Sequence, residues 1–104
     1  MKKAYDKKAA FFSRSVRKRV TGVKRVILFG SRARGDAREG SDYDFAVILQ
    51  KKNSGSIKAV RGTEVAFLNR YDMLSSSIIL DEPGWEMHKK LPIGINIQRE
   101  GVLL

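Results

Sequence analysis

The sequence has no cysteine, one histidine and two prolines among its 104 residues, and it has no long hydrophobic run. Without cysteine there is no disulfide framework, no thiol nucleophile and no cysteine zinc site, and one histidine leaves little for a transition metal. Any metal site must therefore use oxygen ligands. No apolar run approaches the roughly 18 residues of a membrane span, and the first residues lack the apolar segment of a signal peptide. We therefore expect a cytoplasmic protein with no membrane contact.

Acidic residues are also scarce, and the shortage is local. The chain carries 21 Lys plus Arg against 11 Asp plus Glu, a formal charge of +10. Residues 1–38 hold 13 basic and 2 acidic side chains, whereas residues 39–104 hold 8 and 9. The basic block predicts an anionic partner, for example nucleic acid, a nucleotide phosphate or an acidic protein face. The alternative is a helix whose basic face is simply solvated.

The residues that are present are sufficient for one small domain over 1–104, because 42% of the chain is hydrophobic and can build a core. The hydrophobic pattern predicts helices over residues 4–20 and 57–72 and strands over 23–29, 42–49 and 77–80. Loops are expected over 32–41 and 50–56, and a turn over 81–84. A short helical piece over 84–90 and an edge strand over 95–98 follow. This order favours an α+β fold, a mixed sheet with helices on one face.

Trp85 and His88 lie outside the main pattern and need an interpretation. Trp85, together with Met87 and Leu91, is expected to form a small satellite core. His88 lies beside two lysines and is interpreted as a surface histidine rather than a catalytic base.

The strand predicted over 42–49 begins with two carboxylates. Side chains alternate across a strand, so Asp42 and Asp44 point to one side, with Cα atoms roughly 7 Å apart. Two like charges beside an apolar run repel each other and are costly to desolvate unless a cation neutralises them. Mg²⁺ is the natural candidate, because it takes carboxylate oxygens and shares its coordination shell with phosphates. The pair therefore predicts a metal site.

The turn after the preceding strand predicts a phosphate site. A glycine at position 30 lets the backbone approach a ligand closely, and backbone N–H groups with the Ser31 hydroxyl can hold phosphate oxygens, the more so if Ser31 opens a short helix. Arg32 and Arg34 follow at once, and their guanidinium groups pair well with phosphate. Ser41, just before the aspartate pair, either bonds near it or is a plain turn residue.

These residues form a known pattern. Gly30-Ser31, ten residues, and then Asp42-Tyr43-Asp44 give G-S-x10-D-x-D, within the segments G-S-R-A-R-G and S-D-Y-D. The sequence resembles the DNA polymerase β-like nucleotidyltransferase superfamily and, within it, the minimal nucleotidyltransferase (MNT) proteins, which are about this short. The segment Arg99-Glu100-Gly101 adds a weaker likeness. The resemblance implies the polymerase β-like fold, a mixed sheet packed against two main helices.

The resemblance also implies a reaction. Gly30 and Ser31 are expected to bind a nucleoside triphosphate, by family likeness ATP, and Asp42 and Asp44 to hold catalytic Mg²⁺. An acceptor oxygen would attack the α-phosphate, so that a nucleotidyl group, AMP, is transferred and pyrophosphate leaves.

The sequence departs from the superfamily at one position. The superfamily has a third carboxylate on the strand after the second helix, where this chain has serines, with Ser76 the best equivalent. Asp72 comes too early and Asp81 too late. A hydroxyl is a much weaker Mg²⁺ ligand than a carboxylate, so nucleotide binding could survive while transfer is slow or absent.

The resemblance implies a partner as well. A chain this short has no second domain to grip the acceptor, so self-association or another protein should complete the site. MNT proteins commonly pair with a HEPN-domain protein, often a toxin, and act as its antitoxin. Besides the enzyme, the alternatives are an antitoxin-like binding partner with weak catalysis and RNA contact through the basic residues of the first helix, which are Lys2, Lys3, Lys7, Lys8, Arg14, Arg17, Lys18 and Arg19.

Overall fold

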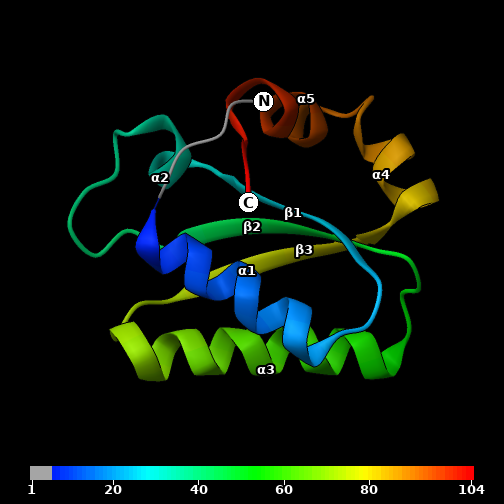
Figure 1. Ribbon diagram of the computed structural model, residues 1–104. Helices are drawn as coiled ribbons and strands as arrows, with labels where there is room; N and C mark the ends of the chain where they lie inside the picture. Colours follow the sequence, from blue (N-terminus) through cyan, green and yellow to red (C-terminus); the bar gives the residue numbers. More distant parts are fainter. Residues whose placement is uncertain (1–5) are drawn as a thin grey trace.

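The fold is a four-stranded mixed sheet between two layers of helices (Figure 1). The computed structural model describes residues 6–104. The elements, in chain order, are α1 (Lys7–Arg19), β1 (Val23–Phe29), α2 (Ser31–Arg34), β2 (Tyr43–Leu49), α3 (Ser54–Tyr71), β3 (Ser75–Asp81), α4 (Glu82–His88), α5 (Pro92–Glu100) and β4 (Val102–Leu103). The strand order is β3-β2-β1-β4, with β2 and β3 parallel and the other neighbours antiparallel. The predicted α+β mixed sheet is confirmed.

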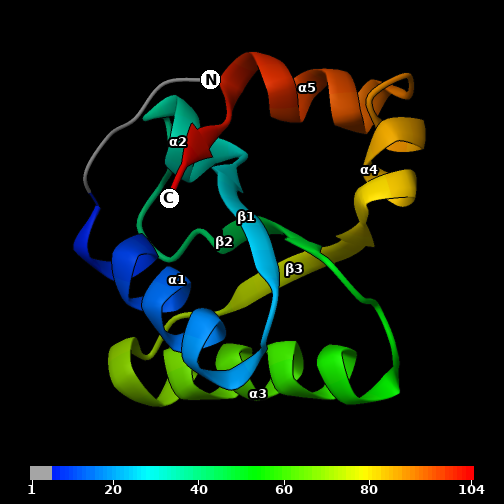
Figure 2. The same cartoon turned by 45° about the vertical axis from the view of Figure 1, so that its right-hand side comes forward.

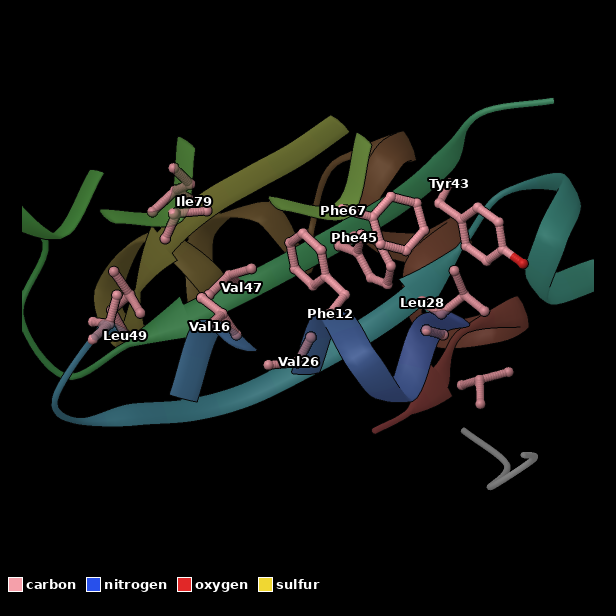
Figure 3. Packing of buried hydrophobic residues seen from close by; sticks show 14 of the residues in the cluster. Phe12, Val16, Val26, Leu28, Tyr43, Phe45, Val47, Leu49, Phe67 and Ile79 are labelled. Atoms are coloured by element: carbon pink, nitrogen blue, oxygen red, sulfur yellow. The ribbon is translucent and has the colours of Figure 1, made fainter. Parts of the chain in front are cut away.

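Helices α1 and α3 cover one face of the sheet, and aromatic side chains fill the space between (Figure 3). Phe12 of α1 stacks on Phe45 of β2 with ring centroids 3.8 Å apart, and Phe67 of α3 meets both rings edge-on. All three are fully buried. These are the two main helices that the sequence predicts, and the apolar face of α1 explains why a helix so rich in lysine and arginine packs here.

The other face of the sheet is covered too, which corrects the prediction of helices on one face only. A second cluster joins Ile27, Ala46, Ile48 and Leu80 of the sheet to Trp85 of α4 and Ile97 of α5. Two views place α4 and α5 on the side opposite α1 and α3 (Figure 1, Figure 2). Trp85 therefore belongs to a core, as predicted, but Met87 and Leu91 do not, because they are 71% and 47% exposed.

The C-terminal quarter differs most from the sequence prediction. Residues 95–98 lie in helix α5 and not in an edge strand, and β4 supplies the edge strand later, at Val102–Leu103. Pro92 is the first residue of α5, where its missing N–H and fixed φ suit a helix start. The predicted turn over 81–84 is also wrong, since Asp81 caps α4 by accepting from the N–H of Gly84.

The remaining bounds are close to prediction. Helix α3 begins at Ser54 inside the predicted loop, because Asn53 and Ser56 form a capping box. The short helix α2 begins at Ser31 and includes the first three residues of the predicted 32–41 loop. Asp6 caps α1, and residues 4 and 5 of the predicted first helix lie outside the described residues. No helix of the described residues 6–104 is long and apolar enough to cross a membrane.

Candidate functional site

The centre of the site is the turn between β1 and α2, at Gly30. Its backbone has φ 75° and ψ −160°, a conformation that residues other than glycine rarely adopt. A Cβ added there would lie 2.4 Å from Oδ2 of Asp44, so the missing side chain lets the carboxylate approach the backbone. Two residues 14 positions apart are thereby brought into contact. The G-S and D-x-D halves of the motif therefore meet.

Asp44 lies on β2 between two neighbouring strands. Its Cα partners are Phe29 on antiparallel β1 and Ser76 on parallel β3. Because side chains alternate, Asp44 shares the α4/α5 face with Ala46 and Ile48, while Tyr43 and Phe45 point to the other face. Burial is the main cause that raises the pKa of Asp44, the charge of Asp42 adds to it, and Arg34 opposes it.

Asp42 precedes β2 by one residue and is exposed. It is near enough for its charge to act on Asp44, so the two carboxylates form an electrostatic pair. A half-buried carboxylate facing a like charge is the arrangement that a divalent cation relieves, and oxygen donors suit Mg²⁺. The donor set therefore fits the expected metal. In residues 6–104 no third acidic or histidine side chain joins it to make a cluster of three.

Ser76 lies beside Asp44, at the position where the family resemblance leads us to expect a third carboxylate. It is exposed and in register beside Asp44, on the same face of the sheet. The two other acidic residues near β3 have structural roles: Asp72 ends α3 with φ 54°, and Asp81 caps α4. Within residues 6–104, neither of them joins Asp42 and Asp44 in a cluster of three possible metal ligands.

Arg32 is held away from Asp44. Its Nε and Nη2 donate to the carbonyl oxygen of Ser41 at 3.2 and 2.9 Å, and its guanidinium lies 4.8 Å from the centre of the Tyr43 ring. Tyr43 points to the α1/α3 face, where it donates its hydroxyl to Asp6 Oδ2 at 3.1 Å. Burial, with the Asp6 charge, raises the pKa of Tyr43 to about 12. Arg32 and Ser41 therefore shape the loop in this structure.

Arg34 is the arginine that the fold turns toward the site. Its Nη1 lies 3.1 Å from Glu100 Oε1 and its Nε 3.2 Å from Asp36 Oδ2, and its charge lowers the pKa of Asp44. The hydrogen bond that Arg34 donates to Asp36 is the largest cause of a raised pKa of Arg34, and Glu100 contributes.

Sequence reasoning assigned no role to Glu100. Its Oε1 accepts from the N–H of Gly30 at 3.2 Å as well as from Arg34. The only signal in the sequence was the R-E-G ending of the family likeness, which names the residue but not its position in space. The N–H of Gly30, expected to hold phosphate, is thus bonded to Glu100 in this structure.

Helix α1, with its basic residues, lies on the face of the sheet opposite to Asp44. Within residues 6–104, none of the α1 lysines and arginines forms an ion pair with an acidic side chain. Arg17 donates to the carbonyls of Val23 and Leu104, so it also ties α1 to the sheet. Arg19 and Lys51 line a pocket of about 470 Å³ at the end of β2 away from Asp44. His88 Nδ1 lies 2.8 Å from the Gly84 carbonyl oxygen, so His88 makes a hydrogen bond within its own helix, α4.

A family model and several solved structures match this chain. A model of the nucleotidyltransferase domain family matches residues 11–90. A toxin-antitoxin crystal structure with AMP-PNP superimposes with a TM-score of 0.66 at 15% identity, covering 91% of this chain and 70% of that one. A mutant of the toxin-antitoxin MntA-HpeT gives 0.63 at 14%, with the same coverage. A putative nucleotidyltransferase from Sulfolobus solfataricus gives 0.54 at 24%, covering 93% and 76%. No curated protein sequence matches.

Proposed function

Because the chain belongs to the nucleotidyltransferase domain family, we propose that it binds Mg–ATP and transfers AMP to an acceptor on a partner protein. The observation that carries the proposal is the contact between the two halves of the motif, where the Asp44 carboxylate abuts the Gly30 turn with Asp42 beside it. A triphosphate held at the turn would lie against the carboxylates that hold its metal.

Each predicted site residue has a place in this proposal. Asp42 and Asp44 would hold Mg²⁺, which when bound neutralises the charge of the phosphate oxygens. The Ser31 hydroxyl and the Arg34 guanidinium would bind the triphosphate, with Gly30 keeping the approach open. Arg32 and Ser41 would act on the nucleotide through the shape of the loop that they close.

The choice of ATP and of a protein acceptor draws support from the fold neighbours. One of them is a toxin-antitoxin with AMP-PNP, and another is the toxin-antitoxin MntA-HpeT. By the family resemblance the partner would be a HEPN-domain protein, and a second copy of this chain is the alternative. The exposed apolar side chains of α4, α5 and the segment between them, such as Met87, Leu91 and Ile95, would suit such contacts.

The test is loss of transfer when the metal pair is weakened. Asp44→Asn should lower Mg²⁺-dependent transfer of labelled AMP by about a hundredfold or more, because an amide is a poor metal ligand and leaves the phosphate charge unneutralised. Asp72→Asn is the matched control, since Asp72 is exposed at the end of α3 and Asn tolerates its positive φ. Equal transfer by wild type and Asp44→Asn would reject the proposal.

A second function, an antitoxin-like partner with weak catalysis, is favoured by Ser76. The serine stands in register beside Asp44 and leaves the carboxylate set incomplete. This function predicts that wild type binds Mg–ATP with little turnover, that Asp44→Asn still neutralises the partner, and that Ser76→Asp raises turnover. Fast pyrophosphate release by the wild-type complex would reject it.

RNA contact through α1 is a third candidate, because the α1 cations have no acidic partner within residues 6–104. Lys2 and Lys3, also predicted to contribute, lie outside the described residues. If the prediction holds, affinity for a short RNA should fall steeply with salt as counterions are released. Salt-independent or undetectable RNA binding would reject this candidate.

A further inference from the structure

We propose that Glu100 is a positioning residue of the nucleotide site, holding the Gly30 turn and the Arg34 guanidinium in the geometry that receives the triphosphate. The inference rests on the proposed function. Its starting point is that one carboxylate oxygen bonds both groups, the N–H of Gly30 at 3.2 Å and Nη1 of Arg34 at 3.1 Å.

The place of Glu100 is fixed by rigid elements. It is the last residue of α5, and β4 follows after one residue and pairs with β1, with Val102 opposite Leu28 and Leu103 opposite Ile27. Continuing this antiparallel register by two residues brings position 100 opposite position 30. The backbone therefore delivers the Glu100 side chain to the Gly30 turn, and the side chain is only 20% exposed there.

Arg34 needs this partner because its other partner pulls it outward. Asp36 lies in the exposed loop, with its side chain 63% exposed, and pairs with Nε of Arg34. Without Glu100, Asp36 would be the one remaining acidic partner of the guanidinium. The guanidinium could then move with Asp36 into solvent, since an exposed ion pair holds its members weakly. With Glu100, the guanidinium is held between helix and loop, where its charge acts on Asp44.

Glu100 does not act as the missing third metal ligand in this structure, because residues 6–104 contain no cluster of three groups able to hold a metal. Its role is on the phosphate side of the site. A carboxylate in this position has one competing interpretation: it could occupy the place of a phosphate and have to be displaced by the nucleotide. The two interpretations predict opposite changes in affinity.

The experiment is a double-mutant cycle on Mg–ATP affinity, measured by calorimetry with Glu100→Gln, Arg34→Gln and the double variant. Glutamine keeps an oxygen that can accept from Gly30 and removes the charge that holds Arg34. We expect Glu100→Gln to weaken binding about fivefold, and the double variant to bind no more weakly than Arg34→Gln alone, because Glu100 acts through Arg34. Glu86→Gln, which breaks the exposed pair with Lys89 on α4, should leave affinity unchanged.

The remaining outcomes each decide a question. Unchanged affinity in Glu100→Gln, additive losses in the cycle, or tighter binding would overturn the inference, and tighter binding would identify Glu100 as a competitor of the phosphate. Absence of Mg–ATP binding by wild type would overturn the proposed function first, and the inference with it. Amide hydrogen exchange at Gly30 without nucleotide gives a second readout: Glu100→Ala should lose protection there, and Glu100→Gln should largely keep it.

Discussion

The two faces of the sheet are covered to different degrees. On the α1/α3 face, β2 presents Tyr43, Phe45, Val47 and Leu49, all buried, and aromatic rings pack from one end of the strand to its middle. On the α4/α5 face, Ala46 and Ile48 are buried, but Asp44 is only half-buried. The same strand thus builds a sealed core on one side and leaves a polar end open on the other.

The difference shows where the fold can carry a reaction. A sealed face stabilises the domain but admits no ligand, whereas α4 and α5 bury the other face only as far as Ile27 and Ala46. At the uncovered end lie Asp44, Ser76 and the Gly30 turn, and Glu100 at the end of α5 bonds to the N–H of Gly30. The open face can therefore bear charge that the sealed face could not.

The largest effect that sharpens this comparison comes from two neighbouring isoleucines of β3. Ile79 is 7% exposed in the sealed core, and Ile78 is half-buried on the other face. Ile79→Ala should lower the free energy of unfolding by about 3 kcal/mol and Ile78→Ala by about 1 kcal/mol, because only the first leaves a closed cavity. Urea unfolding measures both. Equal losses would show that the two faces are packed alike.

A smaller effect is expected at the turn that the open face depends on. Gly30→Ala forces a side chain into a positive φ and against Asp44 Oδ2, so we expect a loss of about 2 kcal/mol and weaker Mg–ATP binding. Gly35 is the matched control: its φ of 85° also disfavours alanine, but no atom lies within 4 Å of the added Cβ. Gly35→Ala should cost about 1 kcal/mol and leave binding intact. If both variants bind Mg–ATP equally well, the Gly30 contact does not shape the site.

Much of this arrangement can be predicted from the sequence. Strong apolar runs place β1 and β2 correctly, and Gly30 and Asp44, which the sequence singles out by their residue types and spacing, lie together in the fold. Ser76 as the neighbour of Asp44 is supported by the register, since the helix between two parallel strands constrains where the second begins.

The rest depends on contacts that local patterns do not encode. Residues 95–98 alternate like a strand, and only Pro92 at a helix start and burial against β1 decide for α5. Glu100 is 70 positions from Gly30, so no spacing rule finds it. Arg32 lies next to a predicted phosphate site in the sequence, yet its guanidinium contacts the Tyr43 ring and the Ser41 carbonyl oxygen instead.

The smallest expected effect is a pH dependence that belongs to the open face alone. Burial and Asp42 raise the pKa of Asp44 above that of an unfolded aspartate, near 3.9. At pH values between the pKa of Asp44 in the unfolded protein and its higher pKa in the folded protein, the folded state binds more protons. Asp44 therefore lowers the free energy of unfolding progressively as pH rises through that window. Above the folded pKa the full loss of stability caused by Asp44 is present, and below the unfolded pKa this loss vanishes. On the sealed face Tyr43, with a pKa of about 12, does not titrate in this range.

Asp44→Asn should therefore gain stability relative to wild type as pH rises through the window, with the difference levelling above it, while its transfer activity is lost. Urea unfolding across about pH 3 to 7 measures the difference, and Asp72→Asn controls for replacing an aspartate elsewhere. A stability difference that stays constant with pH would mean that Asp44 is neither desolvated nor repelled. A difference that follows the window would show that the open face keeps an unfavourable charge in the folded protein, as expected of a group whose natural partner is a cation.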